Sequence, residues 1–256
     1  PMPSEVEISE SGICNRKCSF CPRSDPNYPD INEFISSDLH KKLFDELGEY
    51  NFSGLVIYSG FVEPLLDKNI FKLINETKRN IPKSKCEIVT NGDVLNISRL
   101  KKLFTNGLDT LLISVYDGPE HVIKFQKMCD KAKLKKNQYV IRHRYYSAEK
   151  DFGITISNRA GMMENSEHKI PALKTTLRSK CFYPSYTFFM DYNGDILMCP
   201  HDWGKKMILG NMNDSSFLEI WTSKKAIQIR KRLNKADRGF SPCNVCDVSG
   251  ELIGKK

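Results

Sequence analysis

The first half of the chain alternates between short apolar runs and longer amphipathic stretches. Five runs rich in β-branched and aliphatic residues are each closed by polar or glycine residues, which is typical of buried strands. They lie at 5–9, 53–59, 86–90, 109–116 and 139–145. Apolar residues recur at helical spacing between them, and the predicted helices are 37–47, 67–79, 97–105 and 119–134. Strands that alternate with helices predict an α/β fold with a parallel sheet and right-handed crossovers.

The alternation stops after the fifth predicted strand. Only a few residues separate Tyr146 from the run 154–157, so a sixth strand would follow a short loop and not a helix. The predicted architecture is therefore a partial parallel (β/α) barrel, with its chemistry at the C-terminal ends of the strands. We divide the chain into a barrel domain, residues 1–165, and a small C-terminal domain, residues 166–256. In the latter, the stretch 191–199 predicts a β-hairpin that turns at Asn193-Gly194, and a helix is expected to reach Leu233.

Three of the nine cysteines follow the first strand as Cys14-x3-Cys18-x2-Cys21. Three thiolates can ligate three irons of a [4Fe-4S] cluster and leave the fourth iron open for an outside ligand. A zinc knuckle is the alternative, but structural zinc takes four ligands, and no fourth Cys or His lies nearby. The spacing favours the cluster.

Four further cysteines lie in the last third of the chain. They are Cys181, Cys199, Cys243 and Cys246. The predicted hairpin would hold Cys199 close to Cys181, and Cys243-x2-Cys246 supplies two more thiols on a tight loop. Four thiols suffice for one fully ligated cluster and equally for structural zinc, so the spacing leaves both open.

The first cysteine run, with the aromatic Phe20 before its last Cys, resembles the radical SAM enzymes. In that family S-adenosylmethionine (SAM) chelates the open iron. The pattern C-x12-G-x4-C followed by a late C-x2-C resembles the SPASM domain in its shortened twitch form; Leu252 stands where a full domain has a further Cys. The resemblance implies SAM and two [4Fe-4S] clusters, the second ligated by the four late cysteines.

Several residues are candidate cofactor contacts. Gly60-Phe61-Val62-Glu63-Pro64 resembles the family's G-G-E-P motif with Phe61-Val62 in place of the usual small pair, which implies that Glu63 binds the methionine amino group. A helix-capping Glu-Pro is the alternative. The resemblance also implies contacts from Phe20, Asn91 and Ser114.

Two arginines on the fifth strand are expected to point into the barrel. Arg142 and Arg144 share a strand face with Val140, and the opposite face suits packing against helices. One arginine could pair bidentately with the SAM carboxylate and the other with substrate. A snorkelling surface pair is the alternative.

Ser157-Asn158-Arg159-x-Gly161, together with Thr90-Asn91-Gly92-Asp93, resembles the twitch-type radical SAM dehydrogenases, which oxidise an aminocyclitol hydroxyl to a ketone. This implies that Arg159 reaches substrate between the two clusters, although a structural arginine would explain it as well. His201 is a candidate base with a pKa near neutrality, or a residue that surrounds the second cluster.

The predicted function is oxidation of a hydroxyl on a small sugar-like or aminocyclitol substrate, with the auxiliary cluster as electron acceptor. An epimerase that uses Cys86 or Cys129 as hydrogen donor is one alternative. A maturase of a peptide or protein side chain is another, which the thirteen residues before Cys14 do not favour. A zinc-bearing nucleic-acid-binding protein is the alternative that is not an enzyme.

Charge and hydropathy add to these predictions. Lys and Arg number 39 and Asp and Glu 31, a net charge of +8. This favours an acidic electron donor of the flavodoxin or ferredoxin type, or an anionic substrate, and a merely solvated basic surface explains it too. Lysines spread along helices without an aromatic-basic module do not favour nucleic acid. No apolar stretch could cross a membrane, and free cysteines suit metal binding in the cytoplasm.

Overall fold

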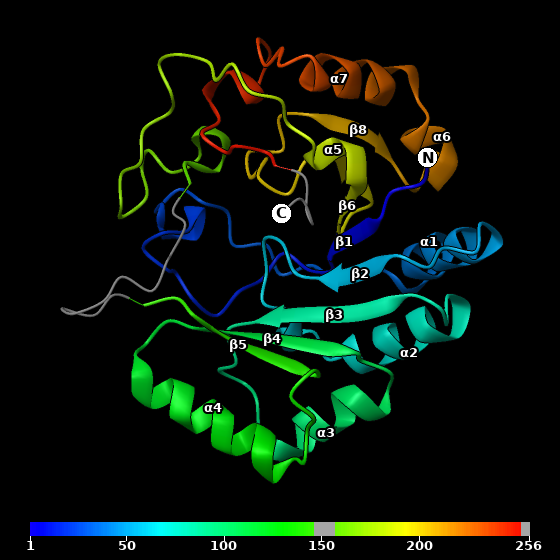
Figure 1. The fold of residues 1–256 in the computed structure, drawn as a ribbon, viewed down its shortest axis with the longest axis vertical. Coiled ribbons are helices and arrows are strands. Elements are labelled where there is room, and N and C mark those ends of the chain that lie inside the picture. Colours follow the sequence, from blue (N-terminus) through cyan, green and yellow to red (C-terminus); the bar gives the residue numbers. More distant parts are fainter. Residues whose placement is uncertain (146–156, 252–256) are drawn as a thin grey trace.

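The computed structural model describes residues 1–145 and 157–251. Within them lies one eight-stranded sheet in the order β5-β4-β3-β2-β1-β6-β7-β8 (Figure 1). Neighbouring strands from β5 to β6 are parallel, and β7 and β8 are antiparallel. The strands are β1 (Glu5–Ser9), β2 (Leu55–Tyr58), β3 (Lys85–Thr90), β4 (Thr110–Val115), β5 (Tyr139–His143), β6 (Thr187–Asp191), β7 (Asp195–Leu197) and β8 (Ile208–Asn211).

Four helices connect the first five strands, as the sequence predicts. They are α1 (Ser37–Glu49), α2 (Ile70–Asn80), α3 (Ile97–Thr105) and α4 (Pro119–Lys131). Side-chain caps set where two of them begin: Ser36 accepts from Leu39 N, and Asn96 accepts from Arg99 N. The partial parallel barrel is therefore confirmed.

The C-terminal part adds strands to the same sheet. β6 pairs in parallel with β1 along its whole length, from Glu5 opposite Thr187 to Ser9 opposite Asp191. The predicted hairpin of β6 and β7 is confirmed, and Gly194 in its turn has a φ of +90° that favours glycine. The helices here are α5 (Tyr183–Tyr186), α6 (Phe217–Trp221) and α7 (Lys224–Asn234). Strands from both sides of residue 165 belong to the same sheet, so the division into two domains stays a prediction.

The sixth strand predicted at 154–157 lies outside the described residues except for Ser157, which belongs to no strand. β6 instead lies on the free edge of β1 and has the parallel direction of a barrel strand.

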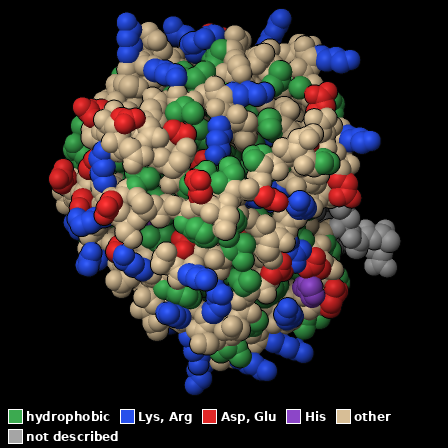
Figure 2. Space-filling view, turned by 180° about the vertical axis from the view of Figure 1, so that it is seen from behind, with side chains coloured by type: hydrophobic (Ala, Val, Ile, Leu, Met, Phe, Trp, Pro, Cys, Tyr) green, Lys and Arg blue, Asp and Glu red, His purple; other side chains and the backbone are tan. Residues whose placement is uncertain are grey.

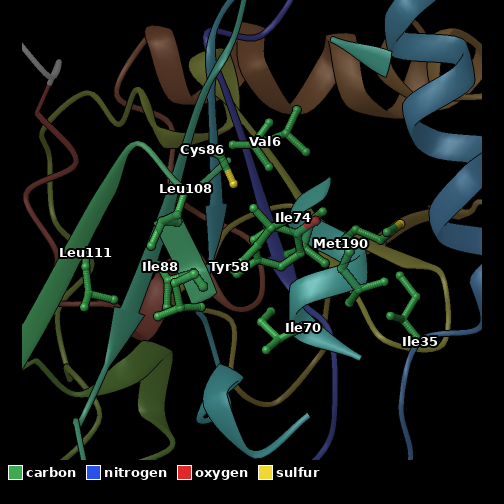
Figure 3. Close-up of a cluster of buried hydrophobic side chains, with 14 of the residues drawn as sticks. Val6, Ile35, Tyr58, Ile70, Ile74, Cys86, Ile88, Leu108, Leu111 and Met190 are labelled. Carbon is green, nitrogen blue, oxygen red and sulfur yellow. The ribbon is translucent and has the colours of Figure 1, made fainter. Parts of the chain in front are cut away.

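Side chains alternate between two faces of the strands. Val6 of β1, Tyr58 of β2 and Ile88 of β3 are fully buried against the helices (Figure 3), and so is Ile8 of β1. On the opposite face, the same strands carry the carboxylates of Glu5, Glu7 and Glu87. One face of the sheet is thus the apolar core, and the other is polar and faces the barrel interior. No helix of the described residues is long and apolar enough to cross a membrane.

Tyr58 brings one hydrogen-bonded polar group into this apolar core. Its hydroxyl lies 2.8 Å from Nε2 of His40 and 2.7 Å from Oγ1 of Thr77, and all three side chains are fully buried. Such groups are costly to bury unless they are bonded, so the three side chains depend on one another.

We expect Tyr58→Phe to lower the free energy of unfolding by about 1–3 kcal/mol, because His40 and Thr77 would each lose a partner in an apolar environment. Urea denaturation at neutral pH measures it. Tyr139→Phe is the matched control: its hydroxyl accepts from Gln126 at the surface, and its loss should cost less than about 0.5 kcal/mol. If both variants lost the same free energy of unfolding, the buried hydroxyl would contribute no more to stability than the surface hydroxyl.

Candidate active site between two cysteine clusters

The loop that carries Cys14, Cys18 and Cys21 leaves the C-terminal end of β1. The amide of Cys21 donates to the carbonyl of Cys18, which folds the loop tightly. The buried guanidinium of Arg23 donates to the carbonyls of Gly12 and Phe61 and fixes the loop base against the end of β2. The three thiols therefore line one cavity at the strand ends.

Arg16, inside the same loop, ties it to β3 and β4. Its guanidinium pairs with Asp93 and Asp117, which follow those two strands, at 2.5–2.6 Å. Asn15 adds a bond to Asp93 at 2.7 Å and accepts from Asn91 at 2.8 Å. These partners lie 76 or more residues away in sequence, and no local signal predicts them.

The cavity has a volume of about 730 Å³ and gathers the predicted residues from separate strands. Besides the three cysteines, it is lined by all the sequence-predicted cofactor and catalytic residues, namely Phe20, Glu63, Asn91, Ser114, Arg142, Arg144, Arg159 and His201. The inward direction predicted for Arg142 and Arg144 agrees with this placement. Phe20 packs on Tyr116, with ring centroids 5.3 Å apart.

The carboxylate of Glu63 already accepts hydrogen bonds within the protein, which the sequence does not predict. Its carboxylate accepts from Thr90 Oγ1 at 2.6 Å, from the amide of Asn91 at 2.7 Å and from the amide of Leu65 at 3.1 Å. The helix-capping alternative is thus present, because Glu63 caps the short turn Pro64–Leu66. A ligand that donates to Glu63 would share carboxylate oxygens that already accept hydrogen bonds from the end of β3.

The unusual Phe61 fills space between the barrel and the C-terminal strands. It is 3% exposed and packs on Phe189 of β6 and on Trp203, with ring centroids 5.0 Å and 4.7 Å away. Phe61 and Trp203 line the cavity. A pair of small residues here would leave this contact unmade.

The other four cysteines line a second cavity. Cys199 follows β7, Cys243 and Cys246 lie on a short 3-10 turn (Cys243–Val245), and Cys181 precedes α5. Burial, and after it the neighbouring thiols Cys181 and Cys246, raise the pKa of Cys243 to about 12. In the first group, burial followed by Cys21 and Cys14 likewise raises the pKa of Cys18 to about 12. Each group is therefore close enough for its thiols to interact.

Arg238, which the sequence analysis missed, holds the second group together. Its buried guanidinium donates to the carbonyls of Ser179, Lys180, Val248 and Ser249. These residues flank Cys181 on one side and Cys246 on the other, so the arginine joins the two segments that supply the thiols. Position 250 must be glycine as well, because a Cβ there would lie 2.4 Å from Sγ of Cys181.

Asn158 connects Arg159 to the cysteine turn. It is fully buried, its side chain donates to the carbonyl of Val245 at 2.7 Å, and its amide donates to Asp247 at 2.8 Å. Arg159, Ala160 and Gly161 follow with φ values of 47°, 53° and 87°, three left-handed residues in succession. Backbone of this kind persists only where its surroundings hold it, and here the cysteine turn does so.

Arg159 and His201 meet at the boundary of the two cavities. Nη1 of Arg159 lies 3.4 Å from Nδ1 of His201, and the buried Nε has no hydrogen-bond partner among the described residues. His201 packs edge-on against Tyr183, with ring centroids 5.0 Å apart. Both rings line both cavities.

The near-neutral pKa expected for His201 is wrong. Burial, and after it the charge of Arg159, lowers the pKa of His201 to about 3, so the ring is neutral at physiological pH. The sequence could not reveal this, since it does not show the guanidinium beside the ring.

Both cysteine groups suit an iron–sulfur cluster by donor chemistry. Three thiols that line a large cavity would ligate three irons and leave the fourth for an outside ligand, and four thiols around a small cavity would form a closed set. All nine cysteines are free thiols. In the described part of the chain, no three His, Cys, Asp or Glu side chains form a ready site for a single metal ion.

Comparison with known proteins agrees with this arrangement. Residues 8–163 match the Radical SAM superfamily, and residues 181–247 match SPASM, an iron–sulfur cluster-binding domain. The chain is 30% identical over 245 residues to the S-adenosyl-L-methionine-dependent 2-deoxy-scyllo-inosamine dehydrogenase of Niallia circulans, covering 95% of this chain and 92% of that protein.

Solved structures show the same similarity. The crystal structure of BtrN in complex with AdoMet and 2-DOIA superposes with a TM-score of 0.81 at 28% identity, over 97% of this chain and 94% of that one. Native anSMEcpe with bound AdoMet gives a TM-score of 0.62 at 14% identity, over 96% and 93% of the two chains, which shows the fold alone.

We expect Arg238→Met to release metal from the C-terminal cysteines and spare the first group, because the segments beside Cys181 and Cys246 would lose their shared donor. Anaerobically purified protein should then fall from roughly eight to roughly four irons per chain, since each [4Fe-4S] cluster holds four. Arg230→Met is the control: Arg230 donates to the carbonyl of Trp221 and lines neither cavity. Unchanged iron in Arg238→Met would contradict the role assigned to Arg238.

Proposed function

The chain belongs to the radical SAM superfamily, and on that basis we propose that it is a dehydrogenase that oxidises a hydroxyl of a small sugar-like or aminocyclitol substrate to a ketone. One observation carries this proposal. The cavity with the three-cysteine loop shares a wall, made by His201, Tyr183 and Val248, with the cavity of the four remaining cysteines. A substrate in the first cavity would therefore lie between two redox centres.

Cys14, Cys18 and Cys21 would hold the cluster that binds SAM, and Cys181, Cys199, Cys243 and Cys246 would hold the auxiliary [4Fe-4S] cluster. When bound, these groups supply a hydrogen-abstracting radical on one side of the substrate and a one-electron acceptor on the other. Oxidation of an alcohol to a ketone removes two electrons and two protons. A hydrogen atom from carbon accounts for one of each, so the hydroxyl proton and the second electron must leave by other routes.

Residues of the wall would serve that second half of the reaction. The guanidinium of Arg159 would donate to the hydroxyl oxygen and stabilise the negative charge that develops there as its proton leaves. Its buried Nε has no hydrogen-bond partner among the described residues. His201, neutral and 3.4 Å from Arg159, would orient the guanidinium or accept the proton.

The cavity has features that suit SAM. One of Arg142 and Arg144 is the proposed partner for its carboxylate and the other is the proposed partner for the substrate, and Asn91 and Ser114 offer polar groups to its ribose. Phe20, which packs on Tyr116 with the ring planes tilted by 38°, would contact its adenine, because aromatic rings favour aromatic partners. The arginine that SAM leaves free supports the expectation of an anionic substrate group, which stays a prediction.

We propose an acidic electron donor of the flavodoxin or ferredoxin type, supported by the net charge of +8. On the face in Figure 2, Lys and Arg side chains are spread among acidic ones and form no single patch, which does not favour nucleic acid. The nine free thiols fit a reducing compartment, so we also propose a cytoplasmic location.

The alternatives have less support. An epimerase of this design needs a thiol beside the substrate, but Cys86 and Cys129 are fully buried among core residues and line neither cavity. Figure 3 shows Cys86 among the apolar side chains of the core. A maturase would place a peptide in the cavity, and nothing in its lining favours one. A zinc-bearing nucleic-acid-binding protein leaves the large cavity and its arginines without a role.

The decisive experiment measures product mass after anaerobic turnover with 2-deoxy-scyllo-inosamine and related sugars. The wild-type product should be two mass units lighter than the substrate. Cys243→Ala should still form 5′-deoxyadenosine and yet lose ketone formation, because the second electron has no acceptor. Cys86→Ala is the matched control and should behave as the wild type.

A product of unchanged mass after turnover in H2O that is one mass unit heavier after turnover in D2O would instead establish an epimerase. Full ketone formation by Cys243→Ala would show that the auxiliary cysteines do not serve the oxidation.

A further inference from the structure

Helix α7 concentrates the positive charge of the chain on one short segment. Residues 224–235 contain six basic side chains and no acidic one, whereas the whole chain has a net charge of +8. The six are Lys224, Lys225, Arg230, Lys231, Arg232 and Lys235. The function described above uses none of them.

Four exposed side chains form a row on the outer face of α7. At about 100° of rotation per residue, Lys224, Ile227, Lys231 and Lys235 lie within roughly a quarter-turn of one another. All four are exposed, Ile227 by 38%. Arg232 pairs with Asp237, but the three lysines of the row have no ion-pair partner among the described residues. An apolar side chain among unpaired positive charges suits an acidic protein partner.

The opposite face of α7 packs on the four-cysteine group. Ile229 and Leu233 are buried in one cluster with Cys181 and Cys243, and Leu233 lines the cavity of the four thiols. The amide of Cys181 donates to the carbonyl of Leu233 at 3.3 Å. Figure 1 shows α7 at the outside of the molecule, beside the red C-terminal segment. Only the width of one helix, about 10–12 Å with its side chains, therefore separates the row from the thiols.

The proposed oxidation creates a need at this place. Every turnover would leave one electron on the four-cysteine side, and the next turnover requires that this electron be removed. The remaining cysteines, Cys86 and Cys129, are single thiols buried in the core. The described residues thus offer no third cysteine group that could take the electron, and a separate carrier must do so.

We propose that the α7 row is the docking surface for an acidic one-electron carrier protein that discharges the auxiliary cluster. The carrier, of the flavodoxin or ferredoxin type, would gain one electron as the cluster loses one, and no bond is made or broken. This proposal rests on the proposed function, because it assumes that the four cysteines hold the electron acceptor. Nucleic acid fits the row less well, since the row has no aromatic side chain on which a base could stack.

The test isolates the auxiliary cluster within the full chain. Replacement of Cys14, Cys18 and Cys21 by Ala should leave roughly four irons per chain, all on the C-terminal cysteines. This protein is reduced, freed of reductant and mixed anaerobically with an oxidised carrier, flavodoxin and ferredoxin in turn. Stopped-flow absorbance gives the second-order rate constant of transfer, and titration gives the affinity of the carrier.

The variant Lys224→Gln/Lys231→Gln/Lys235→Gln should lower both the rate constant and the affinity by roughly tenfold at low salt, and added salt should reduce the difference.

The matched control removes the same charge elsewhere. Lys124, Lys127 and Lys131 are exposed on α4, which lies beside β5 at the opposite end of the sheet from α7 (Figure 1). Their joint replacement by Gln should change the rate constant and the affinity by less than about threefold, through long-range steering alone.

Three results would overturn the proposal: equal effects of the two triple variants, no electron transfer to either carrier from iron-loaded protein, or an oligonucleotide that binds the α7 row while neither carrier does. A chain without iron after loss of the first three cysteines would refute the auxiliary cluster and the docking surface together. Transfer that depends on the α7 row, combined with an unchanged product mass in turnover, would refute the dehydrogenase function and still support the surface.

Discussion

The pairing of β1 with a strand on each edge is the constraint on which the whole site depends. β1 bonds to β2 on one side and to β6 on the other, both in parallel, although β6 begins about 180 residues later in the chain. The C-terminal ends of β2, β1 and β6 therefore meet at one edge of the sheet. The three-cysteine loop leaves this edge in the middle, and the hairpin after β6 delivers Cys199 beside it. Without the pairing of β1 and β6, the two cysteine groups would have no fixed separation.

The same central strand carries the acidic residues of the interior. Glu5 and Glu7 are buried on β1, and each accepts a hydrogen bond from a neighbouring hydroxyl, that of Thr187 or Ser59. Burial of a carboxylate opposes folding, and one hydroxyl compensates only in part. An apolar inner face would stabilise the barrel better. Polar side chains there suit a barrel interior that binds a ligand.

Local patterns predicted much of the fold and most of the cavity lining. Apolar runs and helical spacing located the five parallel strands and four helices, and Asn193-Gly194 located the hairpin, because these signals arise within a few residues of chain. The attachment of β6 to β1 could not be predicted in this way, since any apolar strand could have taken that edge.

Arg16 and Arg238 were missed for a related reason: their partners are remote carboxylates and carbonyls, and an arginine in a loop looks the same whether it is solvated or fully bonded. The alternation of Glu5, Val6, Glu7 and Ile8 contains the signal for an acidic inner face. Strand periodicity applied to charge as well as to hydrophobicity would have revealed it.

The connection between Arg159 and the four-cysteine turn links metal binding to substrate binding. Arg159 occupies a left-handed backbone conformation that Asn158 maintains through the carbonyl of Val245, which lies between Cys243 and Cys246. A turn of this kind gains much of its order when its thiols are ligated, because metal binding contributes directly to folding. The guanidinium is thus placed correctly only when the turn is formed. In this way the residue proposed to act on the substrate hydroxyl depends on the same segment that would hold the electron acceptor, so the two proposed halves of the oxidation would be assembled together.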